Sequence, residues 1–486
     1  MSVLDTSIVN VAISAMSKEF GSSTDQIQWV STAYTLCLGV VVPASAWLGE
    51  RFGPRRVYLV SLLAFALASA LCGMAPDLPT MIVFRILQAI PGGIIPVTCL
   101  TILYRLAPPG KLGTAMAMYG LGAVVAPGVG PTLGGNLVEY VDWRLIFYIN
   151  VPIGLVAAVA AMAVVPRLGT GRAHRFDVLG FGCIAGGLFA LLLATSQGHE
   201  WGWTSYPVLI LAVAGVLLLA LFVITELEVE HPLLELRAFA CWPFVNSLLL
   251  TAVLFAAIYT VLFYVPLFLQ TGQGITAVNA GLVLLPQALV LMVMMPLAGR
   301  VYDLVGARWP AMIGFAVLAL GTVMMMRITA DVSRAQLAAW MVVRAFGTGL
   351  AMMPIITSGV AALPGRMVDT GSALNTLVQR VAAAIGLAAL TALATARQAQ
   401  NMADRAALMP SSDSGRSLLA SVRADPDALL MLRERLVLDA TAGAFRTVFL
   451  LTAFGAMAGV LLASLLPHGR PVPPDPGTAA PEVRDV

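Results

Sequence analysis

The sequence predicts an all-α polytopic membrane protein in which two six-helix bundles flank two inserted helices, a total of 14 transmembrane helices. Three observations support this fold class. Hydrophobic residues make up 59% of the 486 residues and charged residues 11%, whereas about 25% of residues are charged in an average soluble domain. Apolar runs of about 20 residues, the length that crosses a bilayer as a helix, recur along the chain. Two segments of the first half also recur in the second half.

The predicted spans are separated mostly by short connections that contain charged residues, Gly or Pro. We place the spans near residues 1–16, 28–48, 57–75, 80–103, 113–137, 146–165, 177–197, 206–225, 243–269, 277–297, 309–327, 335–360, 371–396 and 441–466. A helix over 1–16 is only about 24 Å long, whereas the hydrocarbon core is about 30 Å thick. We therefore hypothesise that the natural protein starts upstream of Met1, which would bring Asp5 deep into the membrane.

The spans divide the chain into three regions and a tail. Residues 1–166 form the predicted N-terminal bundle, 167–240 the two-helix insertion and linker, and 241–466 the C-terminal bundle. The one long polar connection, 397–439, mixes Arg and Asp with Leu at helical spacing. The tail, 467–486, is Pro-rich and is predicted to be a disordered cytoplasmic segment.

The loop cations predict the orientation, because cytoplasmic loops of membrane proteins carry an excess of Lys and Arg. With the N-terminus inside, the short inner loops hold Arg51, Arg55, Arg56, Arg105, Lys111, Arg167, Arg172, Arg175, Arg237, Arg300, Arg308 and Arg366. The short outer loops hold only Lys18, Arg144, Arg327 and Arg334. Both termini are therefore expected in the cytoplasm and the 397–439 connection outside. The preference for Arg over Lys, with abundant Ala, is typical of a high-GC bacterium, so the expected location is a bacterial cytoplasmic (inner) membrane.

Composition also argues against several partners. The net charge of +3 gives no reason to expect a nucleic-acid partner. The five cysteines fall singly within or beside apolar segments, without the spacing of a metal site or of a disulfide framework. We therefore expect no metal and no cofactor, and the lipid bilayer as the main surrounding.

An internal repeat supports two related bundles. The segment from Ala46 to Arg55, after the second span, matches the segment from Gly299 to Arg308, after the tenth. A weaker match relates the segment starting at Arg85 in the fourth span to the segment starting at Arg344 in the twelfth. Duplicated halves related by an axis along the membrane normal occur in secondary transporters.

Asp5 is the first residue that could carry chemistry. A charged side chain at membrane depth costs about 2.5–3.5 kcal/mol and usually has a function, which for a carboxylate in a transporter is reversible protonation. Alternatively, Asp5 caps the helix at the membrane surface. The residues leave both interpretations open.

Arg85 lies about two turns into the fourth span, one turn before Gln88. We interpret it as a fixed cation that tunes a neighbouring carboxylate and relays the effect of protonation. The alternative is an arginine that extends to the interface.

The repeated loop segment predicts a gate at the cytoplasmic face. Its two copies contain an acid, a glycine turn and basic residues: Glu50, Arg51, Gly53 and Arg55 in the first, and Gly299, Asp303, Gly306 and Arg308 in the second. Such an acid can cap a neighbouring helix N-terminus and pair with Arg, and so hold the two halves together. A solvated basic loop explains the arginines but not the repeated acid and glycine.

The fifth span contains the block Gly130, Pro131, Gly134 and Gly135. Small residues allow helices in lipid to approach closely, and neighbouring helices let a membrane helix tolerate Pro and Gly. The block is therefore either a packing face or a pliable helix about which two halves of a transporter move.

Polar residues within the spans are the candidates for a substrate cavity: Asn10, Gln88, Gln287, Arg344, Asn375, Gln379 and Arg380. The second bundle has no acid at membrane depth, and a dicationic substrate would need one. This pattern favours neutral, zwitterionic or anionic amphiphiles, or monocations held by aromatics. Alternatively, Arg344 and Arg380 reach backbone carbonyls or the interface and do not contact the substrate.

Several motifs together resemble one family. The segment from Asp142 through Asn150 to Gly154 reads D-W-R-L-I-F-Y-I-N-V-P-I-G, and His231-Pro232 opens a linker into the second bundle. With the Asp5 segment, the gate and the fifth-span block, these resemble the fourteen-helix drug:proton antiporters of the EmrB/QacA type, in the major facilitator superfamily.

The resemblance implies the major facilitator fold and a proton-coupled antiporter that exports hydrophobic or amphiphilic small molecules by alternating access. It implies proton coupling at Asp5 and Arg85 and an antiporter motif in the fifth span. The outer segment itself is either an external amphipathic helix or a docking surface for a periplasmic adaptor protein. Alternatives are an uptake symporter or a dedicated metabolite exporter of the same fold. A polytopic membrane enzyme, a remote alternative, should show clustered His, Asp or Glu at a membrane face. With four His in all, no enzyme activity is expected.

Overall fold

The computed structural model describes residues 1–108, 110–167, 175–229, 232–275, 277–329, 332–408 and 426–467. Within these ranges the secondary structure is helical throughout. The central part of the predicted 397–439 connection and most of the predicted tail lie outside the described residues.

A helix lies at each predicted position. The first half contains α1 (Ser2–Phe20), α2 (Thr24–Phe52), α3 (Pro54–Gly73), α4 (Leu78–Leu106), α5 (Leu112–Tyr140), α6 (Leu145–Tyr148) and α7 (Asn150–Val164). A hairpin of α8 (Val178–Trp201) and α9 (Tyr206–Glu228) follows. The second half contains α10 (Trp242–Leu267), α11 (Ala277–Val305), α12 (Arg308–Met325), α13 (Arg334–Ala361), α14 (Val368–Leu408) and α16 (Pro426–Ala463), with short turns η1 (Leu236–Ala240), η2 (Phe268–Gly272) and η3 (Gly365–Met367).

Most of these helices are suited to a membrane. In the described residues, 12 helical spans are long and apolar enough to cross a bilayer, and neither α1 nor α5 is among them. The count of 14 transmembrane helices therefore stays a prediction. The lipid-facing character is clearest on α9, where Leu209, Ile210, Val213 and Leu217 are exposed.

Helix ends follow ordinary capping chemistry. The Ser23 hydroxyl accepts from the Gln26 N–H while the Gln26 side chain accepts from the Ser23 N–H, which is a complete capping box for α2. The Asp77 carboxylate accepts from the Thr80 N–H at 2.8 Å and starts α4. These polar residues lie between apolar runs and fix where each helix begins.

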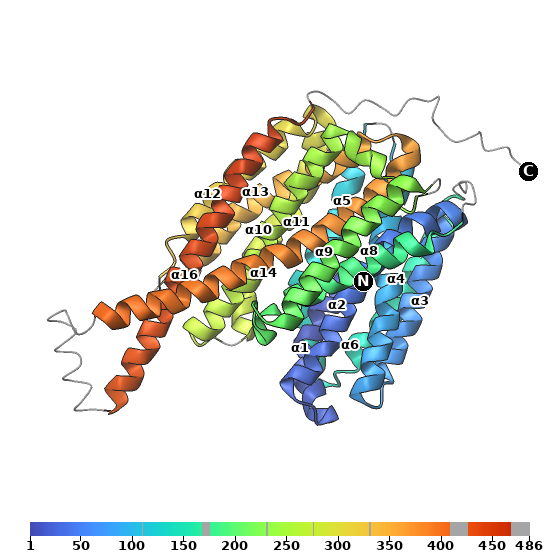
Figure 1. The fold of residues 1–486 in the computed structure, drawn as a ribbon. Helices are drawn as coiled ribbons and strands as arrows, with labels where there is room; N and C mark the ends of the chain where they lie inside the picture. The colour runs from blue at the N-terminus through green and yellow to red at the C-terminus, as the bar shows by residue number, and fades with distance from the viewer. Residues whose placement is uncertain are drawn as a thin grey trace, which may run out of the picture.

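The helices form two halves joined along two seams (Figure 1). Helix α5 of the first half packs along α11 of the second, and α2 packs along α14. The α8–α9 hairpin contacts both α2 and α14, so it lies over the second seam. We call the end with the α2–α3, α4–α5 and α11–α12 connections the repeat end, because it holds both copies of the repeated segment.

The two copies of the repeat share a backbone geometry. Gly53, between α2 and α3, and Gly306, between α11 and α12, both have φ of 82°. A side chain at either position would be strained, because this region favours glycine. The repeated glycine predicted from sequence therefore makes the same turn in both halves.

Helices α5 and α11 approach each other most closely at the repeat end. A Cβ atom on Gly299 would lie 2.4 Å from the Gly113 carbonyl oxygen and 2.6 Å from the Ala117 Cβ. Because the nearest obstacle is backbone, it cannot move aside as a side chain would.

We therefore expect Gly299→Ala to lower the free energy of unfolding by about 1–3 kcal/mol, the usual cost of overpacking a well-packed interior. Thermal unfolding of the purified protein in detergent measures the change. Gly281→Ala is the matched control on the same helix, since a Cβ there meets nothing within 4 Å. Equal free energies of unfolding for the two variants would show that α5 and α11 can move apart without loss of stability.

Candidate functional site

The first site is a buried polar cluster around Asp5 on α1. Asp5 is 1% exposed. Its Oδ2 accepts from Arg85 Nη1 of α4 at 2.5 Å. Its Oδ1 accepts from Gln88 Nε2 and from Asn150 Nδ2, each at 3.0 Å. Three donors from two other helices therefore hold one carboxylate inside the first half.

Arg85 is fully buried and is held on several sides. Its Nε donates to the Val30 carbonyl at 3.2 Å, and its guanidinium carbon lies 3.9 Å from the centre of the Tyr34 ring. Gln88 also donates to the Ser69 hydroxyl at 2.7 Å. The cation is thus neutralised by Asp5 and stacked on an aromatic face, an arrangement that favours Arg over Lys.

The structure brings together three residues that were predicted from sequence to be functional: Asp5, Arg85 and Gln88. Gln88 was predicted to line a substrate cavity, whereas its side chain binds Asp5. Asn150 was given no role, although it stands in the D-W-R…N block on which the family resemblance rests. Its amide in an otherwise apolar segment is the sequence signal that could have identified it, and in the structure Asn150 is 1% exposed.

The second site joins the two halves at the repeat end. Asp303 of α11 accepts from the Gly113 N–H at 2.7 Å, from the Thr114 N–H at 3.0 Å and from the Thr114 hydroxyl at 2.7 Å. These groups are the first turn of α5, so an acid of the second half caps a helix of the first half.

A cross-half ion pair stands beside the first copy of the repeat. Arg105 Nη2, at the end of α4, donates to Asp369 Oδ2, at the start of α14, at 2.6 Å. Glu50 lies within electrostatic range of both. The Tyr104 hydroxyl also donates to the carbonyls of Ile356 and Thr357 on α13, at 3.0 and 2.8 Å. The repeat end is therefore closed by polar contacts between the halves.

The gate prediction also included three arginines: Arg51, Arg55 and Arg308. Arg55 Nη2 donates to the Met162 carbonyl of α7 at 2.7 Å, within the first half. Arg51 is exposed in the last turn of α2, and Arg308 is the first residue of α12. The acid of each copy was predicted to hold the two halves together. In the structure Asp303 makes such a contact. Beside Glu50 the contact between the halves is the ion pair of Arg105 with Asp369, a residue that was not predicted to be functional.

A cavity of about 600 Å³ lies between the two halves. Its walls come from α1, α4, α5, α10, α11, α13 and α14, and it extends to Glu139 and Tyr140 in the exposed last turn of α5. That turn is at the end opposite the repeat end. Apolar walls with a few polar groups are typical of a small-molecule site of this size.

Four of the seven cavity candidates line this space: Gln287, Arg344, Gln379 and Arg380. Asn375 is not among the lining residues, but its Oδ1 accepts from Gln379 Nε2 at 2.6 Å. Asn10 is also outside the lining, and its side chain accepts from the Ser31 hydroxyl of α2 at 3.1 Å. Their roles in binding stay predictions.

The fifth-span block packs on α1. A Cβ on Gly130 would lie 2.7 Å from the Ser7 hydroxyl oxygen, and a Cβ on Gly134 would lie 2.9 Å from an Ile8 methyl carbon. Gly135 lines the central cavity, and Pro131 lies within α5. The block thus forms a close-packing face toward α1, and its use as a pliable segment stays a prediction.

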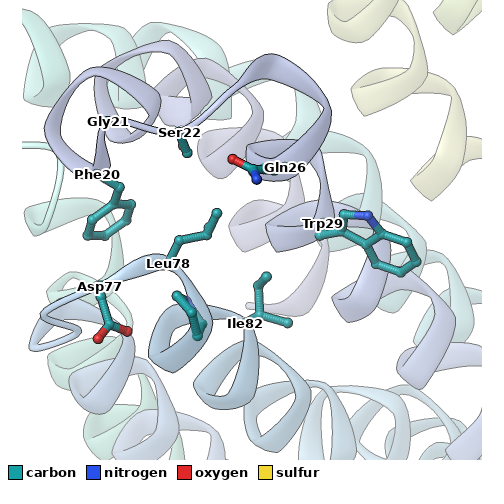
Figure 2. Close-up of a pocket in the computed structure, with 9 residues that line it drawn as sticks. Phe20, Gly21, Ser22, Gln26, Trp29, Asp77, Leu78 and Ile82 are labelled. Atoms are coloured by element: carbon teal, nitrogen blue, oxygen red, sulfur yellow. The ribbon is translucent and has the colours of Figure 1, made fainter.

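A second hollow, of about 610 Å³, lies where the α1–α2 turn meets the start of α4. Figure 2 shows Phe20, Trp29, Leu78 and Ile82 around it. None of the residues predicted from sequence to carry function lines it. In the described ranges no group of three or more His, Cys, Asp or Glu could hold a metal ion.

Two related helical halves that enclose a central cavity are the architecture of a secondary membrane transporter. The chain belongs to the Major Facilitator Superfamily, since the model of that family matches residues 1–177 and 173–387.

Curated relatives agree with this family. The chain is 30% identical to the "Multidrug resistance protein B homolog" of Mycobacterium tuberculosis, over 96% of this chain and 88% of that protein. It is also 30% identical to the "Tetracenomycin C resistance and export protein" of Streptomyces glaucescens, over 82% of this chain and 74% of that protein.

Among solved structures, the proton:xylose symporter XylE superposes with a TM-score of 0.61 at 12% identity, over 97% of this chain and 95% of that one. At this identity the likeness shows the fold alone.

Proposed function

We propose that this transporter is a proton-coupled antiporter that exports hydrophobic or amphiphilic small molecules by alternating access. The observation that carries the proposal is the Asp5 carboxylate, buried against Arg85 at 2.5 Å in a chain whose halves enclose a cavity. Relatives named for multidrug resistance and for export support the outward direction. In this proposal α1 and α5 also cross the bilayer, as in the EmrB/QacA type.

In this proposal the repeat end lies on the cytoplasmic side of a bacterial inner membrane, with both termini inside, because the loop cations favour that orientation. The contacts of Asp303 and Arg105 then close the cytoplasmic end, and the cavity extends toward the outer end. With this orientation the structure corresponds to an outward-facing state. Release of substrate and loading of a proton belong to this state.

Packing connects the proton site with the closed end. Asp5 lies one turn from Ser7 and Ile8, the residues of α1 that pack on Gly130 and Gly134 of α5. The same helix α5 begins with the residues that Asp303 caps. A proton that binds Asp5 removes the countercharge of Arg85, and the resulting shift of α1 against α5 weakens the α5–α11 contact.

The proton gradient supplies enough free energy for this cycle. One charge that crosses a membrane potential of 100 mV releases about 2.3 kcal/mol, apart from the contribution of the pH difference. Each 1.4 kcal/mol changes an equilibrium constant about tenfold. One proton that crosses this potential can therefore shift the balance between the two states about 50-fold.

The test uses energised inside-out vesicles in which the pH gradient is followed while cationic, neutral and anionic amphiphiles are added. We expect at least one compound to dissipate the gradient in vesicles that contain the protein and to leave it intact in vesicles without it. A folded and inserted protein that never moves protons with any compound would contradict antiport and favour uptake or another driving force.

A further inference from the structure

The charge of the central cavity is uneven. Its lining includes two arginines, Arg344 on α13 and Arg380 on α14. Among the described lining residues the acid is Glu139, in the exposed last turn of α5. Asp5 does not line the cavity, and its oxygens are taken by Arg85, Gln88 and Asn150.

Arg344 is buried without a countercharge. Arg344 is 3% exposed, and its Nη2 donates to the Ala257 carbonyl of α10. Its Nε is buried with no hydrogen-bond partner, and the same holds for the Nε of Arg380. Arg85, Arg105, Arg144 and Arg366 each pair with an acid, whereas neither Arg344 nor Arg380 forms such a pair with a described residue.

The matched arginine in the first half shows what is missing. Arg85 and Arg344 occupy corresponding helices, yet Arg85 has Asp5 at 2.5 Å while Arg344 has a backbone carbonyl. A buried guanidinium is costly unless an anion pairs with it. Because no residue of the described cavity wall supplies that anion near Arg344, a molecule in the cavity can.

Resting on the proposed export function, we propose that the transported substrates are amphiphilic organic anions whose acidic group binds Arg344 and Arg380. A planar guanidinium binds a carboxylate or sulfonate through two parallel hydrogen bonds. Gln287 and Gln379 also line the cavity and carry amide N–H donors. Apolar residues of the lining, including Phe255, Leu285 and Met352, surround the body of the molecule.

The test compares three probes that share one apolar body: pyrenebutyrate, pyrenebutanol and pyrenebutylammonium. Binding to the full chain in lipid nanodiscs is measured by equilibrium dialysis, with empty nanodiscs subtracted to remove partition into lipid. We expect the anion to bind most tightly. Arg344→Gln and Arg380→Gln should each weaken its binding about 10–100-fold and leave pyrenebutanol binding unchanged.

Two variants control for folding and for general charge. Arg344→Lys keeps a cation but loses the two-pronged geometry, so its binding should lie between those of the wild type and Arg344→Gln. Arg366→Gln removes an arginine that pairs with Glu235 outside the cavity and should bind like the wild type. If Arg344→Gln does not fold, Arg380→Gln carries the comparison.

The outcomes separate this inference from the proposed function. If the alcohol or the ammonium probe binds as well as the anion and also drives proton movement in vesicles, the inference fails and antiport stands. If the anion binds through Arg344 but moves no protons, antiport fails and the inference stands. Lack of saturable binding by all three probes also overturns the inference.

Discussion

Asp5→Asn is expected to abolish proton movement coupled to substrate. The asparagine amide cannot bind and release a proton as a carboxylate does, so vesicles with this variant should behave like vesicles without protein. The change also leaves the buried Arg85 without its anion, and loss of one partner of a buried pair costs about 3–5 kcal/mol. Thermal unfolding in detergent and the vesicle pH assay measure the two effects separately.

A double variant separates stability from coupling. Asp5→Asn combined with Arg85→Gln removes both charges, so we expect it to recover much of the lost stability while proton movement stays absent. Asp142→Asn is the carboxylate control, because Asp142 only accepts from the Arg144 N–H at the far end of the first half. Proton movement by Asp5→Asn at the wild-type level would show that another group carries the proton.

Asp303→Ala is expected to open the repeat end. The variant loses the three hydrogen bonds from Gly113 and Thr114, and a hydrogen bond to a charged group contributes about 1.5–3 kcal/mol. Loss of even one shifts the balance between closed and open states about tenfold or more. Spin labels at Lys111→Cys and Arg300→Cys, in a protein without its five native cysteines, report the separation of α5 and α11.

We expect a population at longer distance to grow in Asp303→Ala and to grow less in Asp303→Asn, which keeps one acceptor oxygen. Asp142→Ala removes an acid at the far end of the first half, so it should leave the distances unchanged. An unaltered distance distribution in Asp303→Ala would mean that this cap does not hold the halves together.

The helices and the repeat could be predicted from sequence because their signals are local. Apolar length marks each span, and the glycines at Gly53 and Gly306 mark the repeated turn. A carboxylate beside Arg85 was also expected, since unpaired charges are costly in the membrane, although the sequence did not specify that this carboxylate is Asp5. These residues are few in an apolar chain, so each leaves few possible partners.

Helix rotation could not be predicted in the same way. In a helix that is apolar on all sides, hydrophobic periodicity does not distinguish the face toward lipid from the face toward the cavity. Asn10 therefore contacts Ser31 rather than lining the cavity, and Gln88 binds Asp5. Asp369 was missed because its partner, Arg105, is far away in sequence and was explained by the loop-charge rule alone.

Because of the α8–α9 hairpin, the two sides of the molecule present different surfaces to the lipid. Helix α8 of the hairpin packs on both α2 and α14 and so covers the seam between them, whereas among the described residues neither α8 nor α9 makes a comparable contact with α5 or α11. For an exporter whose substrate dissolves among the acyl chains, we therefore expect lateral entry on the side of α5 and α11 and not on the side that the hairpin covers.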